Sequence, residues 1–220
     1  MAFQLQNGII NNLFISENML IDVSLKLKEG MVFREGSPPF SITSLKCYHQ
    51  NEGEYTTSMI NTPAHIGTHI DVIGKDNLIK LDRFIGRGVL IDVSNVKESQ
   101  ISMKHIINQN IVKKGDFVFF RTDWSKKIGV NDYYDHPELS FEVLDFLVGK
   151  EINMVGIDAL GLGKGKNHGV YDRYLASKGV YIIENLTNLD LIKKESFIVY
   201  CFPLSAENLE AIPARVVVDV

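Results

Sequence analysis

Short runs of apolar and β-branched residues recur along the chain, each bounded by glycine or polar residues. Seven such runs begin at Leu20, Gly88, Asp116, Ile152, Gly179, Phe197 and Ala214. Runs of this length and composition are typical of buried β-strands. Because helix-like segments lie between several of them, the pattern predicts an α/β fold.

Helices are expected over residues 102–110, 140–149 and 171–178. Ser102 and Ser140 are the expected N-caps of the first two, because a serine side chain can accept a hydrogen bond from the first helical turn. Gly179 follows the third segment and is its expected C-cap.

The chain has 220 residues, of which 45% are hydrophobic and 23% charged, and its formal net charge is −4. These values are ordinary for a soluble globular protein, and the length favours one domain over residues 1–220. No block of basic residues stands out, so we expect no nucleic-acid partner. No run of about 18 apolar residues occurs, and the N-terminal residues lack the basic region of a signal peptide.

Only two cysteines, Cys47 and Cys201, are present, and they form no CxxC pair. Two reduced thiols are favoured over a disulfide between them, which fits a reducing compartment. We therefore expect a cytoplasmic protein that does not enter a membrane.

Residues 56–73 interrupt the apolar pattern, because polar and small residues alternate there. In a strand, His65, His69 and Asp71 would share one face. Two imidazoles and a carboxylate suit a divalent transition metal such as zinc or manganese. Gly67 lies between the histidines and is expected to leave room for a metal, water or substrate. The alternative is a polar turn with two solvated histidines and a capping aspartate.

A second group of polar residues lies about a hundred residues later. His168 and Asp172 would be neighbours one turn apart on a helix, and Glu184 ends an apolar run. A carboxylate at the end of a buried strand is costly unless it is paired or bound to a cation. Taken alone, these residues also fit a histidine–aspartate pair at a helix start and a glutamate emerging at a strand end.

Together, the motif His65-Ile66-Gly67-Thr68-His69-Ile70-Asp71 and the later Glu184-Asn185-Leu186 resemble the cyclase family of metal-dependent hydrolases. That family includes bacterial kynurenine formamidase and isatin hydrolase. Weaker matches extend the resemblance along nearly the whole chain, at residues 22–24, 36–40, 122–124, 155–158 and 202–204. The resemblance implies one compact, cyclase-like (swivelling β/β/α) domain with a mixed β-sheet core, and usually a homodimer or larger homo-oligomer.

The resemblance also implies a ligand set. His65, His69, Asp71 and Glu184 match the metal ligands of the family, which holds one or two divalent ions. Asp172 stands where the formamidases have a histidine, and aspartate can also bind a divalent ion. His168, one helical turn earlier, is an alternative ligand or a group that contacts one.

Two further positions concern the reaction. Lys75 stands where the formamidases carry a general acid/base histidine, and Ile73 replaces the proline before it. A lysine could take that role only if burial or nearby cations lowered its pKa; otherwise it is an exposed residue without a role. Trp124 matches a loop near the pocket, where its ring could stack on a planar substrate, unless it is a core residue.

These matches predict a metal-dependent hydrolase that cleaves the C–N bond of a small-molecule amide or cyclic amide, as arylformamidases do. His168 or Lys75 would carry a proton to the leaving nitrogen. Two alternatives stay open: a ring-closing or lyase-type reaction at the same metal site, and a metal- or ligand-binding protein that lost catalysis with the change at Lys75.

Overall fold

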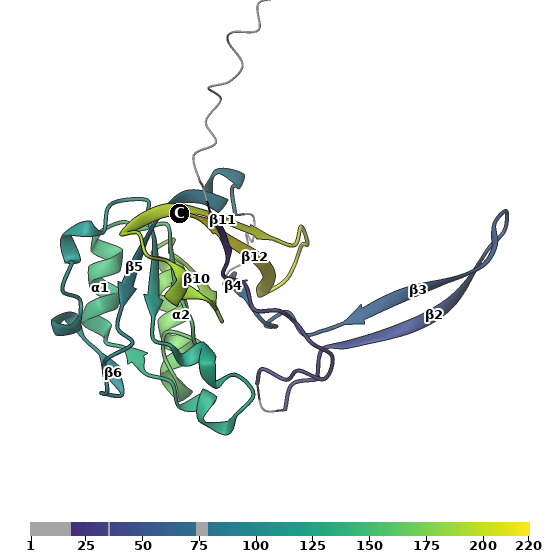
Figure 1. Cartoon of the computed structure of the whole chain (residues 1–220), viewed down its shortest axis with the longest axis horizontal. Coiled ribbons are helices and arrows are strands. Elements are labelled where there is room, and N and C mark those ends of the chain that lie inside the picture. Colours follow the sequence, from purple (N-terminus) through teal and green to yellow (C-terminus); the bar gives the residue numbers. More distant parts are fainter. Residues whose placement is uncertain (1–18, 35, 74–78) are drawn as a thin grey trace, which may run out of the picture.

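A mixed, eight-stranded sheet that closes on itself forms the body of the protein (Figure 1). The computed structural model describes residues 19–34, 36–73 and 79–220. The order of the strands is β1-β12-β11-β5-β7-β9-β10-β4, and β12 also pairs with β4. The strands are β1 (Leu20–Asp22), β4 (His69–Asp71), β5 (Ile85–Asp92), β7 (Phe117–Arg121), β9 (Met154–Ile157), β10 (Tyr181–Glu184), β11 (Ser196–Pro203) and β12 (Ala211–Asp219).

Closure depends on β12, which meets two strands along one of its edges. Its first residues pair with β4, its last residues pair with β1, and β11 lies along its other edge. Strands β5, β7, β9 and β10 are parallel, whereas the remaining pairs in the ring are antiparallel. All seven predicted strands are present, so the expected α/β fold with a mixed sheet is confirmed.

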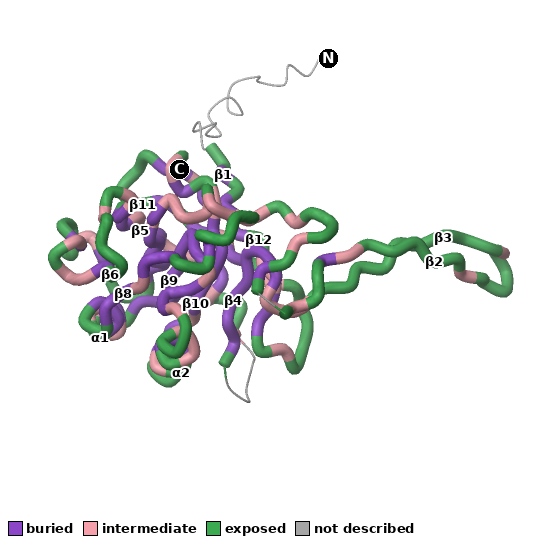
Figure 2. The backbone as a smooth tube through the Cα atoms, turned by 90° about the horizontal axis from the view of Figure 1, so that it is seen from below, coloured by how far each residue is buried: buried purple, intermediate pink, exposed green. Residues whose placement is uncertain are grey.

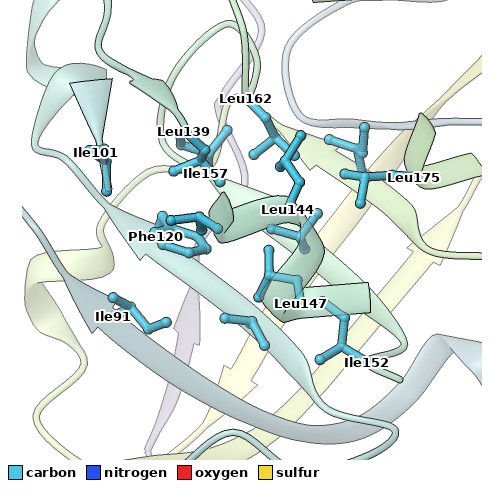
Figure 3. Close-up of a cluster of buried hydrophobic side chains, with 14 of the residues drawn as sticks. Ile91, Ile101, Phe120, Leu139, Leu144, Leu147, Ile152, Ile157, Leu162 and Leu175 are labelled. Atoms are coloured by element: carbon cyan, nitrogen blue, oxygen red, sulfur yellow. The ribbon is translucent and has the colours of Figure 1, made fainter. Parts of the chain in front are cut away.

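Two helices cover one side of the sheet, α1 (Phe141–Gly149) and α2 (His168–Ser177) (Figure 1). Strand β7 is apolar at four consecutive positions because both of its faces are buried. Val118 and Phe120 belong to a first core cluster with Leu144 and Leu147 of α1. Figure 3 shows Phe120 beside these two leucines, while Phe117 and Phe119 belong to a second core cluster. A strand buried on both faces needs apolar side chains at consecutive positions.

Helix α1 begins where the serine predicts. The Ser140 hydroxyl accepts a hydrogen bond from the backbone N–H of Val143 at 3.4 Å. Likewise, α2 is followed by Gly179 at a φ of +73°, as expected for a C-cap glycine. Helix α2 begins at His168, three residues before the predicted start.

Replacing the α1 cap should destabilise the protein modestly. We expect Ser140→Ala to lower the free energy of unfolding by about 1 kcal/mol, because one N–H of the first turn loses its acceptor. Urea unfolding measures the change, and Ser140→Asp, which keeps an acceptor, is the matched control. Equal stability of Ser140→Ala and the unchanged chain would contradict this account of the helix start.

The helix expected over residues 102–110 was wrong. Two short 3-10 turns, Met103–His105 and Gln109–Ile111, take its place. The ring of His105 accepts the backbone N–H of Ser102 and closes a single turn. Ile106 is buried, but Ile107 is 90% exposed, so no continuous apolar face extends along the segment to support a longer helix.

A long β-hairpin that the apolar pattern does not predict projects from the body. It consists of β2 (Ser41–His49) and β3 (Gly53–Asn61), and we call it the arm. The arm extends away from the sheet (Figure 1), and nearly all of its residues are exposed (Figure 2). Its strands mix polar and apolar residues without forming an apolar run.

Short elements complete the described part of the chain. Strands β6 (Gln100–Ile101) and β8 (Glu138–Leu139) form a small parallel pair. The other 3-10 turns are Leu81–Phe84, Trp124–Lys127, Asn131–Asp135, Gly165–Asn167 and Leu189–Leu191. Among the described residues, no helix has the length and apolar character needed to cross a membrane. Both cysteines are free, as expected.

Candidate metal centre

Strands β4 and β10 bring the two predicted groups of polar residues together. They are antiparallel neighbours, and their register places Glu184 directly opposite His69. Side chains alternate along a strand, so His69 and Asp71 lie on the same face of β4. The Nε2 atom of His69 lies 3.4 Å from Glu184 Oε2 and 3.5 Å from Asp71 Oδ1.

His65, His69 and Asp71 form the first ligand group. His65 Nδ1 lies 3.1 Å from His69 Nε2 and 3.2 Å from Asp71 Oδ1. Atoms bound about 2.1 Å from one ion lie about 3.0 Å apart at octahedral angles and about 3.4 Å apart at tetrahedral angles. The three side chains therefore already have the separations that a shared divalent ion requires.

His65 reaches this group from a turn, and the expectation of one strand through residues 65–71 was wrong. Only His69–Asp71 is strand, and Gly67 has a φ of +53°. The reason expected for that glycine was also wrong. A Cβ atom at Gly67 would lie 2.5 Å from Leu27 Cδ2, so the turn and the packing of Leu27 require glycine there.

His168, Asp172 and Glu184 form the second ligand group. His168 is the first residue of α2, and its Nε2 lies 3.6 Å from Asp172 Oδ2 and 3.8 Å from Glu184 Oε1. Both His168 and Asp172 therefore lie close to the Glu184 carboxylate. Because Glu184 also contacts His69, the two ligand groups lie against each other.

Gly161 lies against the second group, and the sequence pattern did not single it out for this reason. A Cβ atom there would lie 2.5 Å from His168 Nδ1 and 2.9 Å from Glu184 Oε1. The His168 ring also donates from Nδ1 to the Gly163 carbonyl at 3.2 Å, since a carbonyl oxygen can only accept. In the neutral ring, Nε2 therefore keeps its lone pair and faces the carboxylates.

Buried carboxylate oxygens that accept no hydrogen bond make this cluster suitable for a cation. Among the described residues, Asp71 Oδ1 and Oδ2, Asp172 Oδ1 and Glu184 Oε1 are buried and accept no hydrogen bond. Leaving charged oxygens in this state is expensive unless a cation or a proton compensates them. Nitrogen and oxygen ligands of this kind suit zinc or manganese, so the residues present fit a divalent metal.

The protonation of the cluster shows the same need for positive charge. Burial lowers the pKa of His69, but its contacts with Asp71 and Glu184 outweigh burial and raise it to about 10. Burial and the charge of Asp71 raise the pKa of Asp172 to about 7, and they raise that of Glu184 well above its ordinary value. Without an ion, protons would have to supply the charge that a metal supplies when bound.

A hydrogen-bond chain behind His69 fixes its orientation. His69 Nδ1 donates to the Gly67 carbonyl at 2.8 Å, so the neutral ring turns its Nε2 lone pair toward the cluster. Asn185 Nδ2 donates to the same carbonyl at 3.0 Å, and the Tyr133 hydroxyl donates to Asn185 Oδ1. Sequence reasoning assigned no role to these two residues, although Asn185 directly follows a predicted ligand.

Two predicted site residues remain, Lys75 and Trp124. Lys75 lies outside the described residues, so its acid/base role stays a prediction. Trp124 donates from Nε1 to the Tyr133 carbonyl at 3.0 Å, packs against the first core cluster, and has the Lys127 ammonium 3.5 Å from its ring centre. The ring is thus partly covered, and its stacking on a substrate also stays a prediction.

Comparison with known proteins decides the family. The model of the Cyclase family, described as "Putative cyclase", matches residues 21–164. This chain belongs to the Cyclase family. Cyclase-like protein 1 from Oryza sativa subsp. japonica is 26% identical over 206 residues, which cover 83% of this chain and 72% of the rice protein.

Solved structures of Cyclase-like proteins share the fold. A "potential metal-dependent hydrolase with cyclase activity" is 27% identical with a TM-score of 0.76, over 92% of this chain and 99% of the other. A "predicted metal-dependent hydrolase" from Bacillus stearothermophilus is 28% identical with a TM-score of 0.75, over 92% and 98%. Isatin hydrolase A from Labrenzia aggregata, at 22% identity and a TM-score of 0.78 over 92% and 94%, shows the same fold.

Proposed function

We propose that this member of the Cyclase family is a metal-dependent hydrolase that cleaves the C–N bond of an amide or a small cyclic amide. One observation carries the proposal: two ligand groups meet at Glu184, with buried carboxylate oxygens that accept no hydrogen bond among the described residues. The metal-dependent hydrolases of the same fold support it. The cyclic amide is suggested by the isatin hydrolases that share this fold.

Five side chains would hold zinc or manganese, as one ion or two: His65, His69, Asp71, Asp172 and Glu184. When bound, the metal supplies Lewis-acid activation of a water molecule and of the substrate carbonyl. The side chain of His65 is 36% exposed, whereas those of His69 and Glu184 are almost fully buried. Substrate would therefore approach from the His65 side of the cluster.

His168 is the group best placed to move a proton. Burial lowers its pKa below the ordinary value, so the ring is neutral at neutral pH. With Nδ1 bound to the Gly163 carbonyl, Nε2 is the atom that can accept a proton from the attacking water and pass it to the leaving nitrogen. Lys75 is the alternative proton donor in this proposal.

Turnover and product analysis test the proposed reaction. The protein is stripped with a chelator, reloaded with zinc or manganese, and assayed with isatin and with N-formyl aromatic amines. We expect turnover only after reloading. In ¹⁸O-labelled water, the acid product should contain one labelled oxygen, because hydrolysis transfers the oxygen of water to the acyl carbon.

A ring-closing or lyase-type reaction is the second candidate, favoured by the cyclase activity ascribed to one structural relative. Such a reaction would leave the product unlabelled and so would contradict hydrolysis. Stoichiometric metal without turnover of amides, cyclic amides or esters would contradict both reactions and favour a protein that only binds metal or ligand.

A further inference from the structure

The three histidines at the candidate metal centre differ in how their outer ring nitrogen is held. His69 and His168 each donate from Nδ1 to a backbone carbonyl, so that Nε2 faces the carboxylates. His65 has the opposite orientation, because its Nδ1 faces His69 and Asp71 and its Nε2 is the outer nitrogen. Among the described residues, none accepts a hydrogen bond from this Nε2. A metal-binding histidine almost always donates from its second ring nitrogen, so His65 needs a partner.

Glu210 supplies a carboxylate on this side of the His65 ring. Its Oε1 lies 3.9 Å from His65 Nε2, which is longer than a hydrogen bond. The Glu210 side chain is 69% exposed, and it forms no other ion pair or hydrogen bond with a described residue. A rotation about the bonds of this side chain is therefore sufficient to bring the carboxylate to the imidazole.

The backbone of Glu210 is fixed against the strand that carries the predicted ligands. Its carbonyl accepts a hydrogen bond from the N–H of Val72 at 2.8 Å. The next residue, Ala211, is fully buried and pairs with Asp71 in the register of β4 and β12. The main chain thus holds the glutamate beside the metal centre, while its side chain stays exposed.

We infer that Glu210 is a positioning residue, whose carboxylate accepts a hydrogen bond from the Nε2–H of His65 while Nδ1 of that ring binds the metal. The inference rests on the proposed function, which assigns His65 as a ligand. Glu210 belongs to neither ligand group. It acts through the imidazole, because the two ring nitrogens point to different sides of the ring.

This contact would favour the form of His65 that can bind a metal. In the structure, His65 Nδ1 lies 3.2 Å from Asp71 Oδ1, an acceptor that favours a proton on Nδ1. A carboxylate at Nε2 favours the other tautomer, in which Nδ1 keeps its lone pair, and it makes the ring a more basic ligand. His65 depends on such a partner more than His69 does, because its side chain is 36% exposed and that of His69 only 1%.

Calorimetric titrations of the full chain with zinc and with manganese test the inference. We expect Glu210→Ala to weaken metal binding by about 10- to 100-fold, the usual cost of losing a group that orients a ligand. Glu210→Gln keeps an oxygen acceptor without the charge and should weaken binding less. The matched control, Glu207→Gln, removes one charge from the same exposed loop between β11 and β12 and should bind metal as the unchanged chain does.

The ¹⁵N chemical shifts of the His65 ring in the zinc-loaded chain provide a readout that a merely structural role would not move. We expect a protonated Nε2 in the unchanged chain and a changed Nε2 shift in Glu210→Ala. Adding Glu210→Ala to His65→Ala should cause no further loss of metal affinity.

Two results would overturn this inference and leave the proposed function intact. One is an unchanged metal affinity and an unchanged His65 Nε2 shift in Glu210→Ala. The other is equal weakening by Glu207→Gln and Glu210→Ala, which would show a general effect of surface charge. An unchanged chain that binds neither zinc nor manganese would overturn the inference and the proposed function together.

Discussion

His69→Ala is expected to abolish metal binding and, with it, turnover. His69 contacts ligands from both groups, through Asp71 on its own strand and Glu184 on the neighbouring strand. Its loss leaves these buried carboxylates without the imidazole that neutralises them in the absence of an ion. Loss of a residue that only hydrogen-bonds to a metal ligand lowers metal affinity by about 10- to 100-fold. Loss of the ligand His69 itself should lower the affinity for zinc or manganese by more than that.

Calorimetric titration with each metal and elemental analysis of the purified protein measure this effect. His49→Ala is the matched control, because His49 is an exposed histidine on the arm. His69→Gln separates charge from shape, since it keeps a polar side chain but cannot carry the positive charge. Full metal occupancy and activity in His69→Ala would exclude this cluster as the metal centre.

The strands of the body could be predicted because strands that are buried must consist of apolar residues. Residues 117–120 lie between two core clusters and must be apolar at every position. The arm could not be predicted in this way, because its strands face solvent and bury no run of side chains.

The candidate site was also predictable only in part. The chemistry of His65, His69 and Asp71 is apparent from residue types and spacing, and the structure places their polar atoms together. The contact between His69 and Glu184 depends on the register of two strands far apart in the chain, which no local pattern encodes. The same applies to Tyr133, since its partner Asn185 lies in a different part of the sequence.

Asn185→Gly is expected to weaken metal binding by about 10- to 100-fold, the usual cost of losing a group that orients a ligand. Asn185 is fully buried, and its amide holds the carbonyl to which His69 donates. Glycine is the informative replacement because Asn185 has a φ of +57°. Alanine would be strained there, whereas glycine removes the amide without strain.

Tyr133→Phe provides the matched test, because it removes only the hydroxyl that donates to Asn185. If the two residues act as one chain, the effects of the single changes on metal affinity should be non-additive in the double variant. The ¹⁵N chemical shift of His69 Nδ1 reports the strength of its hydrogen bond to the Gly67 carbonyl, and we expect that shift to change in Asn185→Gly. Lower stability with unchanged metal affinity and an unchanged His69 Nδ1 shift would mean that Asn185 holds the fold together but does not orient the ligand.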